Sequence, residues 1–299
     1  MRTTSIEAMS IFDVAHGFHD KEAAINFFVD KGLLAKEKQY CGHLASVVKA
    51  KSSDGYEFRC KVCRKSYGSR LGSIFTNSKL KINVLLCALY FFSMKVPICT
   101  LNIVTQLLVS RQSLCQWYAY LREICSHKLL DSNIRLGGLG KIVEMDECCI
   151  GRKRKYNRGR FIGKHCWVFG IICLETKQCV LQIVRRRNRL TLQPIIKRYV
   201  KLGTTIHTDE AKVYNNLTAL GYNHKTVCHK ENYVSATGVH TNNIESFWSC
   251  LKTHLRTMRG VSRKNLPIHL DEYWYRWQVK NKGNFFNVLI KDIKDCYPL

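Results

Sequence analysis

Acidic residues are scarce in this chain, which has 22 Asp and Glu against 48 Lys and Arg and therefore a formal net charge of +26 over 299 residues. A positive excess of this size favours a polyanionic partner, because the field of the whole protein attracts phosphate-bearing polymers. Nucleic acid is the partner that we expect from this charge balance.

Long hydrophobic runs are also missing. The longest run, residues 84–92, is about half of the roughly 20 residues that a membrane-spanning helix needs. The first residues lack the charged start and apolar centre of a signal peptide. We therefore expect an intracellular protein without a membrane partner, and we expect its 15 cysteines to be reduced thiols.

The stretch His240–Lys252 predicts the start of an amphipathic helix. Glu245 and Lys252 fall on a stripe that a buried core does not use. Two interpretations of Glu245 remain open: a ligand-binding acid, or the closing residue of a capping box that begins at Asn242. The apolar residues that recur at helical spacing, and are expected to face a core, are Ile244, Phe247, Trp248, Leu251 and Leu255.

Two further acids follow apolar, strand-like segments: Asp146 in KIVEMDE and Asp209 in TTIHTDE. Alternation along the first segment puts Glu144 on the same face as Asp146, so Glu144 is a rival. We prefer Asp146 because the expected strand ends there, where a ligand can reach it. Two strands ending in Asp, followed by a helix that carries Glu, is the layout of an RNase H-like site. Such a site can hold two Mg²⁺ ions, or Mn²⁺ in their place.

Composition and periodicity divide the chain into five parts and predict an α/β fold. The sheet-forming part is expected to follow the order βββ-α-β-α-β-α, which gives a mixed sheet. The five parts are a helical segment at 1–38, a zinc-ribbon-like β hairpin region at 39–78, a helix-turn-helix-like helical region at 79–136, an RNase H-like mixed-sheet catalytic domain at 137–280 and a C-terminal tail at 281–299.

Cys60 and Cys63 form a CxxC pair at the end of a strand-like segment. Two thiolates at this spacing are half of a tetrahedral zinc site. Cys41 and His43 are the candidates for the other half, because Lys38 stands where a second CxxC would begin. The alternative is a small hairpin with unligated thiols.

Basic residues concentrate in two places that we expect to hold DNA phosphates. The alternatives for the first cluster are a solvated charge run or a nuclear localisation patch. Arg111 opens the second helix of the helix-turn-helix-like pair and is a further candidate, although any αα-hairpin gives the same pattern. The two clusters comprise Arg152, Lys153, Arg154, Lys155, Arg158 and Arg160, and then Arg185, Arg186 and Arg187.

The segments IVEMDE, KYNRGR, WVFG, TLQPIIKRY, GTTIHTDE and HTNNIESFWSCLK follow one another as in transposases of the IS1595 superfamily, and the chain is most similar to its eukaryotic Merlin branch. The resemblance covers residues 138–277. It implies a DDE transposase with an RNase H-like fold, in which Asp146, Asp209 and Glu245 bind the metal ions. It also implies that Lys252 contacts the substrate backbone.

Some positions separate the chain from parts of that superfamily. Bacterial relatives often carry Asn as the third metal-binding residue, so Glu245 favours the Merlin side. The zinc-ribbon region lacks its leading Cys, and Cys228 stands where relatives commonly show Asn.

From these features we expect cleavage and strand transfer at the terminal inverted repeats of a transposon. The partners are then two double-stranded DNAs, the element's ends and the target, with at least a homodimer to bring two ends together and the nucleus as the place of action. Three alternatives remain open: a host-captured transposase that regulates by binding DNA without catalysis, a nuclease of the same fold, and a basic zinc-ribbon scaffold.

Overall fold

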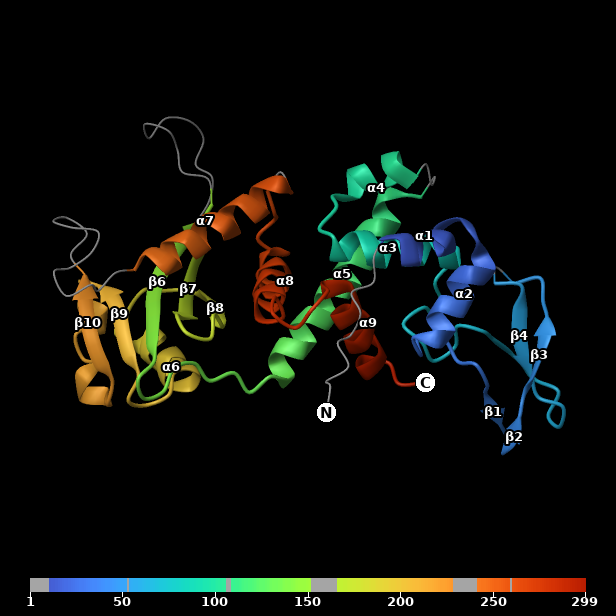
Figure 1. Cartoon of the computed structure of the whole chain (residues 1–299), viewed down its shortest axis with the longest axis horizontal. Coiled ribbons are helices and arrows are strands. Elements are labelled where there is room, and N and C mark those ends of the chain that lie inside the picture. Colours follow the sequence, from blue (N-terminus) through green and yellow to red (C-terminus); the bar gives the residue numbers. More distant parts are fainter. Residues whose placement is uncertain (1–10, 53, 106–108, 152–165, 228–240, 259) are drawn as a thin grey trace. The chain divides into compact units, whose positions relative to one another are not determined.

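The computed structural model groups the chain into two compact units, one formed by 1–128 with 279–299 and the other by 129–278 (Figure 1). None of the helices in the described part of the chain combines the length and the apolar character needed to cross a bilayer. The residues that the structure describes are 11–52, 54–105, 109–151, 166–227, 241–258 and 260–299.

The core of the first unit is built around α3 (Ile82–Ser93), in which every residue except Asn83 is buried. A helix that is apolar on all sides must lie inside the fold, because no face of it suits water. The helices of this unit also include α1 (Ile11–His19), α2 (Lys21–Asp30), α4 (Ile98–Thr105), α5 (Arg111–Asp131) and α9 (Phe285–Cys296).

The C-terminal segment differs from the expected tail. Residues 281–299 contain α9, whose Phe286, Leu289, Ile290 and Ile293 recur every three or four residues and join the core of α3. The chain therefore leaves the first unit within the last turn of α5 and returns to it with the segment that contains α9. The sequence did not predict this return, because the apolar pattern of a 12-residue helix does not identify the element that the helix packs against.

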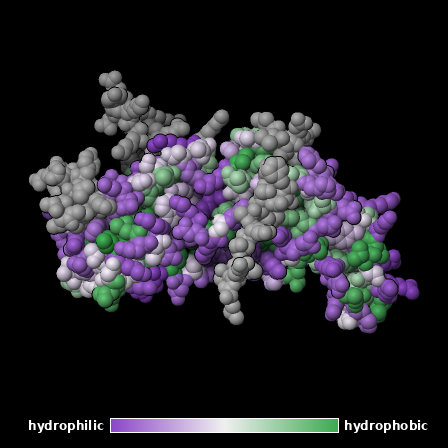
Figure 2. Space-filling view, viewed as in Figure 1, coloured by the Kyte–Doolittle hydropathy of each residue, from purple (hydrophilic) through white to green (hydrophobic). Residues whose placement is uncertain are grey.

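Residues 39–78 form two small sheets. A two-stranded sheet pairs β1 (Gln39–Tyr40) with β2 (His43–Leu44), and a three-stranded sheet has the order β3-β4-β5. Figure 2 shows hydrophobic surface over this part of the chain, where Leu44, Val47 and Val62 are more than half exposed. The strands of the second sheet are β3 (Ser46–Lys49), β4 (Tyr56–Arg59) and β5 (Ser66–Gly68).

The second unit has a five-stranded sheet in the order β10-β9-β6-β7-β8. Strands β6, β7 and β8 are antiparallel neighbours, whereas β9 and β10 run parallel to β6. This mixed order confirms the predicted RNase H-like fold. The strands are β6 (Ile142–Ile150), β7 (Cys166–Cys173), β8 (Cys179–Val184), β9 (Thr205–Asp209) and β10 (Asn223–Val227).

Helices cover both faces of this sheet. Helix α7 (Asn242–Thr257) packs on β6 and β7, and α8 (Leu266–Gln278) packs on β8. Helix α6 (Arg189–Tyr199) lies on the other face, because the Tyr199 hydroxyl accepts a hydrogen bond from Gln182, which shares its face with Glu147 through the register of β6, β7 and β8. Between β9 and β10, the helix expected near 213–220 is instead two short 3₁₀ turns, η2 (Lys212–Tyr214) and η3 (Thr218–Leu220).

The predicted apolar stripe of α7 is confirmed. Ile244, Phe247, Trp248, Leu251 and Leu255 are all buried. The burial of five large side chains along one stripe anchors the helix, since each contributes about 1.5–3 kcal/mol of transfer free energy. The direction of α7 over the sheet is therefore fixed, and with it the position of every polar residue beside the stripe.

Candidate active site

Asp146 and Asp209 occupy equivalent positions on two neighbouring parallel strands. The ladder between β6 and β9 ends with the pair Glu144↔His207, and each Asp lies two residues beyond that pair on its own strand. Residues in parallel register point to the same face of a sheet, and a step of two returns to that face. The two carboxylates are therefore placed side by side on one face, just past the point where the strands part.

Access to Asp146 has a different cause from the one that the sequence suggested. Asp146 is not at the end of its strand, because β6 continues to Ile150. What opens the site is β9, which pairs with β6 only through Glu144. Asp146 is half-buried on the resulting free edge, whereas Glu144 is fully buried.

The face of β6 that carries Asp146 is matched to α7 residue by residue. Glu144 accepts hydrogen bonds from the backbone N–H of Ile244 and the side chain of Asn243, both at 2.8 Å. Two residues further along β6, Asp146 Oδ2 accepts from Trp248 Nε1 at 3.0 Å. Strand β6 and helix α7 therefore run side by side, and a step of two residues along the strand corresponds to a step of four along the helix.

The third contact of this series involves Lys252. Burial raises the pKa of the Cys148 thiol, and the neighbouring Lys252 ammonium opposes that rise. Cys148 follows Asp146 by two residues, and Lys252 follows Trp248 by four. Lys252 is therefore on the side of α7 that faces the sheet, one turn beyond the indole.

Glu245 lies on α7 one turn before Trp248, and its side chain is exposed. Burial raises the pKa of Asp146, and the negative charges of Asp209 and Glu245 raise it further, while the backbone N–H of Glu147 and the Trp248 indole act in the opposite direction. Both other acids therefore lie close enough to Asp146 to perturb its charge.

The capping interpretation of Glu245 does not fit the start of α7. The N-cap residue is Thr241, and Asn242 is the first helical residue, so Glu245 is one position too late to close a capping box. Glu144 instead supplies the carboxylate at this helix end, because it accepts the N–H of Ile244. Glu144, the rival of Asp146, is thus held at a helix N-terminus, where a negative charge is favourable.

The three acids do not form a cluster tight enough for all of them to bind one ion. Within the described ranges, the one group of three or more His, Cys, Asp or Glu whose ligand atoms all lie within 4.8 Å of each other is a cysteine cluster. The carboxylates of Asp146, Asp209 and Glu245 are therefore not gathered around a single point. In a two-ion site with ions about 3.5–4 Å apart and Mg–O distances of about 2.1 Å, oxygens up to roughly 8 Å apart serve the same site. Oxygen donors of this kind fit Mg²⁺ or Mn²⁺.

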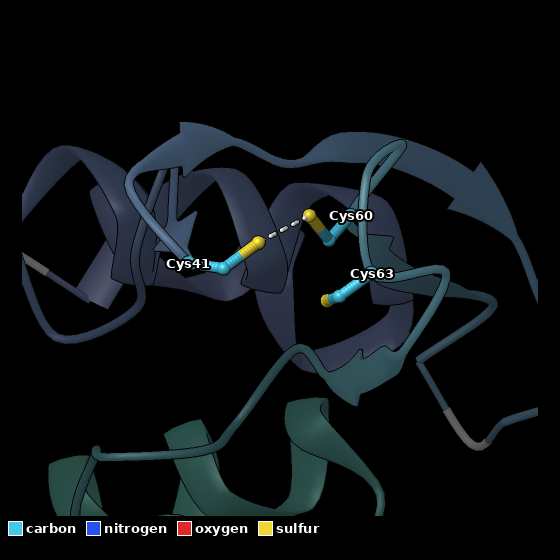
Figure 3. Close-up of side chains that lie close together, drawn as sticks. All are labelled: Cys41, Cys60 and Cys63. Atoms are coloured by element: carbon cyan, nitrogen blue, oxygen red, sulfur yellow. Dashed lines mark hydrogen bonds between the residues drawn. The ribbon is translucent and has the colours of Figure 1, made fainter.

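The cysteine cluster consists of Cys41, Cys60 and Cys63 (Figure 3). The Sγ atoms of Cys41 and Cys60 are 3.3 Å apart, close to the edge of a zinc tetrahedron, which is about 3.8 Å for a Zn–S distance of about 2.3 Å. A hydrogen bond from the backbone N–H of Cys63 lowers the pKa of Cys60 to about 7, whereas the hydrogen bond with Cys60 raises the pKa of Cys41 to about 11. Cys60 is therefore the thiol of this pair that ionises first and can supply a thiolate to a metal.

The fourth predicted zinc ligand does not join this cluster. His43 Nδ1 is 4.0 Å from Cys41 Sγ and lies 2.8 Å from the carbonyl oxygen of Cys41. Lys38, which replaces the expected leading Cys, donates a hydrogen bond to the carbonyl of Leu71. The structure thus brings together three thiols of the predicted set.

The predicted DNA-binding residues are only partly described. Arg185, Arg186 and Arg187 are exposed after β8, and the Arg187 guanidinium lies 3.7 Å from the ring centroid of Trp167. Arg111 is exposed at the start of α5 in the first unit. The first basic cluster lies outside the described residues: Arg152, Lys153, Arg154, Lys155, Arg158 and Arg160.

Two supporting residues were not predicted. Tyr214 donates a hydrogen bond of 2.5 Å to Glu147 Oε1, which links β6, on the face opposite Asp146, to the turn that follows Asp209. Trp248 was predicted only as a core residue, yet its N–H is bonded to Asp146. A buried indole N–H needs an acceptor, and this requirement was the available signal for Trp248.

Comparisons with known proteins find sequences related to transposases. Residues 135–278 match the model of the ISXO2-like transposase domain. An uncharacterized transposase-like protein of Haemophilus influenzae is 26% identical over 112 residues, which cover 36% of this chain and 90% of that protein.

Solved structures with related architecture have low similarity scores. The magnesium-bound HTLV-2 integrase catalytic core has a TM-score of 0.28 at 12% identity, covering 48% of this chain and 87% of that one. The mariner Mos1 paired end complex with Mg has a TM-score of 0.30 at 12% identity, covering 71% of this chain and 77% of that one. Scores this low carry no argument by themselves, and the order of the strands remains the basis of the fold assignment.

The matched residues coincide closely with the second unit, which holds the acids, the sheet and helices α6 to α8. The match to the ISXO2-like transposase domain of the IS1595 family therefore falls on the part of the chain that carries the candidate site.

Proposed function

We propose that the chain is a DNA transposase in which Asp146, Asp209 and Glu245 hold two Mg²⁺ ions, with Mn²⁺ able to replace them. The observation that carries this proposal is the equivalent placement of Asp146 and Asp209 on adjacent parallel strands, with Glu245 near enough to perturb Asp146. Their position within an ISXO2-like transposase domain supports DNA as the substrate.

The residues of the site divide the work of nucleotidyl transfer. When bound, the ions would activate a water or a 3′-hydroxyl and neutralise charge on the phosphoryl oxygens. The three carboxylates bind and orient that pair. Lys252, on the same helix as Glu245, would hold a backbone phosphate beside the ions. The reaction cuts at an element's end and then joins the freed 3′-hydroxyl to target DNA.

The DNA itself is proposed to lie along the basic residues. Arg185, Arg186 and Arg187 are exposed, and stacking on Trp167 limits the freedom of the Arg187 guanidinium before it meets a phosphate. Phosphate contacts of this kind release counterions, so DNA affinity should fall steeply with salt.

Replacement of Asp146 or Asp209 by Asn should reduce strand transfer by roughly 10³-fold or more, since loss of metal-based charge stabilisation is worth several kcal/mol. The assay uses DNA bearing the ends of the element that encodes the chain, a target duplex and Mg²⁺ or Mn²⁺. Covalent joints between donor and target are measured.

Glu210→Gln is the matched control, because Glu210 directly follows Asp209 but is exposed, and its activity should equal that of the unaltered chain. Undiminished joining by D146N or D209N would contradict the mechanism. Cleavage without joining would identify a nuclease, and DNA binding without cleavage would identify a captured regulator.

A second prediction concerns the stability of the metal-free chain. Because burial and two neighbouring acids raise the pKa of Asp146, the folded state binds the Asp146 proton more tightly than the unfolded chain does. The stability linked to that proton is present at low pH and is lost as the pH rises through the raised pKa. Asp146→Asn removes the charge, so its Tm should exceed that of the unaltered chain at pH 7.

The Tm difference is measured by calorimetry in chelator over a pH series. It should disappear below the ordinary Asp pKa of about 3.9, and Glu210→Gln should show no such difference. A D146N chain that melts lower at pH 7 would mean that the Asp146 charge supports the fold rather than the site.

We also propose that Cys41, Cys60 and Cys63 hold one Zn²⁺. Their close sulfurs and the lowered pKa of Cys60 support a thiolate site. The strands of this region are only two to four residues long, and the bound ion would stabilise them as a hydrophobic core does in a larger domain.

Purified protein should therefore contain one zinc per chain by elemental analysis, and Cys63→Ser should lose most of it. Cys99→Ser changes an exposed cysteine of the same unit and should retain the zinc. Equal zinc content in C63S and C99S would remove this part of the proposal.

The proposal extends to the setting of the reaction. Two transposon ends must be held together, which favours a homodimer or larger assembly. The similarity to the Merlin branch and the basic run KRK at 153–155 favour action in the nucleus.

A further inference from the structure

Among the described residues, Trp248 makes the one side-chain hydrogen bond to Asp146. Its indole is 4% exposed, and Nε1 donates to Asp146 Oδ2 at 3.0 Å. A carboxylate offers about four lone-pair positions, so the bonds from the Trp248 indole and the Glu147 backbone N–H leave about two of them for other ligands. The indole thus fixes the orientation of the carboxyl group without closing it to an ion.

The indole ring of Trp248 packs against the sheet at Gly170. Gly170 pairs with Asp146 across β6 and β7, and a Cβ added at Gly170 would lie 2.5 Å from the Cζ2 and Cη2 atoms of Trp248. Real atoms do not approach this closely, so the ring occupies the space that any side chain at position 170 would need. The absence of a side chain on β7 and the bond to β6 together place the N–H beside Asp146.

Another buried tryptophan of the same unit shows what a purely structural bond looks like. Trp274 is 5% exposed, and its Nε1 donates at 2.6 Å to the carbonyl oxygen of Cys179. A backbone carbonyl satisfies a buried indole without charge or function. Trp248 instead has as its acceptor an acid that two other acids repel.

We propose that Trp248 is a positioning residue that holds the Asp146 carboxylate in the orientation in which it binds metal, an inference that rests on the proposed role of Asp146 as a metal ligand. Without the indole N–H, Asp146 is free to rotate away from Asp209 and Glu245, because their negative charges repel it. A partner that orients a ligand in this way typically changes metal affinity by about 10–100-fold.

The test is the affinity of the full chain for Mn²⁺ without DNA. Electron paramagnetic resonance measures it through the signal of the free ion. The D146N variant defines the share of binding that depends on Asp146. Trp248→Phe keeps an aromatic ring and removes the donor, so the Asp146-dependent affinity should fall about 10-fold or more. Trp248→His returns an N–H at the position of the indole nitrogen and should recover affinity to within about threefold of the unaltered chain.

Two further variants separate orientation from general loss of stability. Trp274→Phe removes an equally buried indole bond away from the acids, and it should leave Mn²⁺ affinity unchanged even if its Tm falls. Gly170→Ala keeps Trp248 but displaces the ring, and it should weaken Mn²⁺ binding as W248F does. This variant also serves as the test if W248F does not fold.

Unchanged Mn²⁺ affinity in a folded W248F or G170A, or equal weakening in W248F and W248H, would overturn the positioning role and leave the transposase proposal standing. A different outcome marks failure of the proposed function itself: in that case, the unaltered chain and D146N bind Mn²⁺ alike.

Discussion

The arrangement of the acids depends on the alignment of helix α7 with strand β6. Two residues of a strand span about 6.6 Å and four residues of a helix span about 6.0 Å, so a helix parallel to a strand can meet every second strand residue with every fourth helix residue. This chain does so with Glu144 at Ile244 and Asp146 at Trp248. Lys252 continues the series beside Cys148.

The contact at Glu144 sets the start of this series. A fully buried carboxylate is costly unless its oxygens are bonded, and the Ile244 N–H and Asn243 side chain satisfy it. Because the first turn of α7 is tied to β6 in this way, Glu245 of that turn lies near Asp146, and the next turn brings Trp248 over Gly170. The functional site is thus a consequence of how one helix begins.

Gathering the acids has a cost for the fold. Burial and the neighbouring acids raise the pKa of Asp146, so its charged form destabilises the metal-free chain. The Tyr214–Glu147 bond on the opposite face holds β6 to the turn after Asp209 and thereby resists the separation that the repulsion favours. Bound cations and DNA would relieve it, which agrees with a chain that carries a +26 excess of positive charge.

The sequence was informative where a pattern is local. Strand alternation and helical spacing predicted β6 to β10 and the buried stripe of α7, because apolar periodicity follows directly from which face is buried. It could not show that β9 leaves β6 after Glu144, since pairing between residues 63 positions apart leaves no local trace. For that reason Asp146 was wrongly placed at the end of a strand.

The partners of polar side chains were equally hidden. Glu245 was spaced for a capping box, yet the cap comes from Glu144, about one hundred residues earlier. Trp248 fitted an apolar stripe, which accounts for its ring but not for its N–H. His43 had metal-ligand spacing, but its ring turns to the carbonyl of Cys41, a choice that only the turn geometry decides.

The most direct test of the central claim is a crystal structure of the full chain with Mn²⁺, in which anomalous scattering locates the manganese ions. The account predicts two manganese positions about 3.5–4 Å apart, with carboxylate oxygens of Asp146 and Asp209 as ligands and Glu245 completing the site. The account would be contradicted if manganese were bound at Glu147 or Glu144 instead. It would also be contradicted if the carboxylates of Asp146 and Asp209 bound no manganese ion in common.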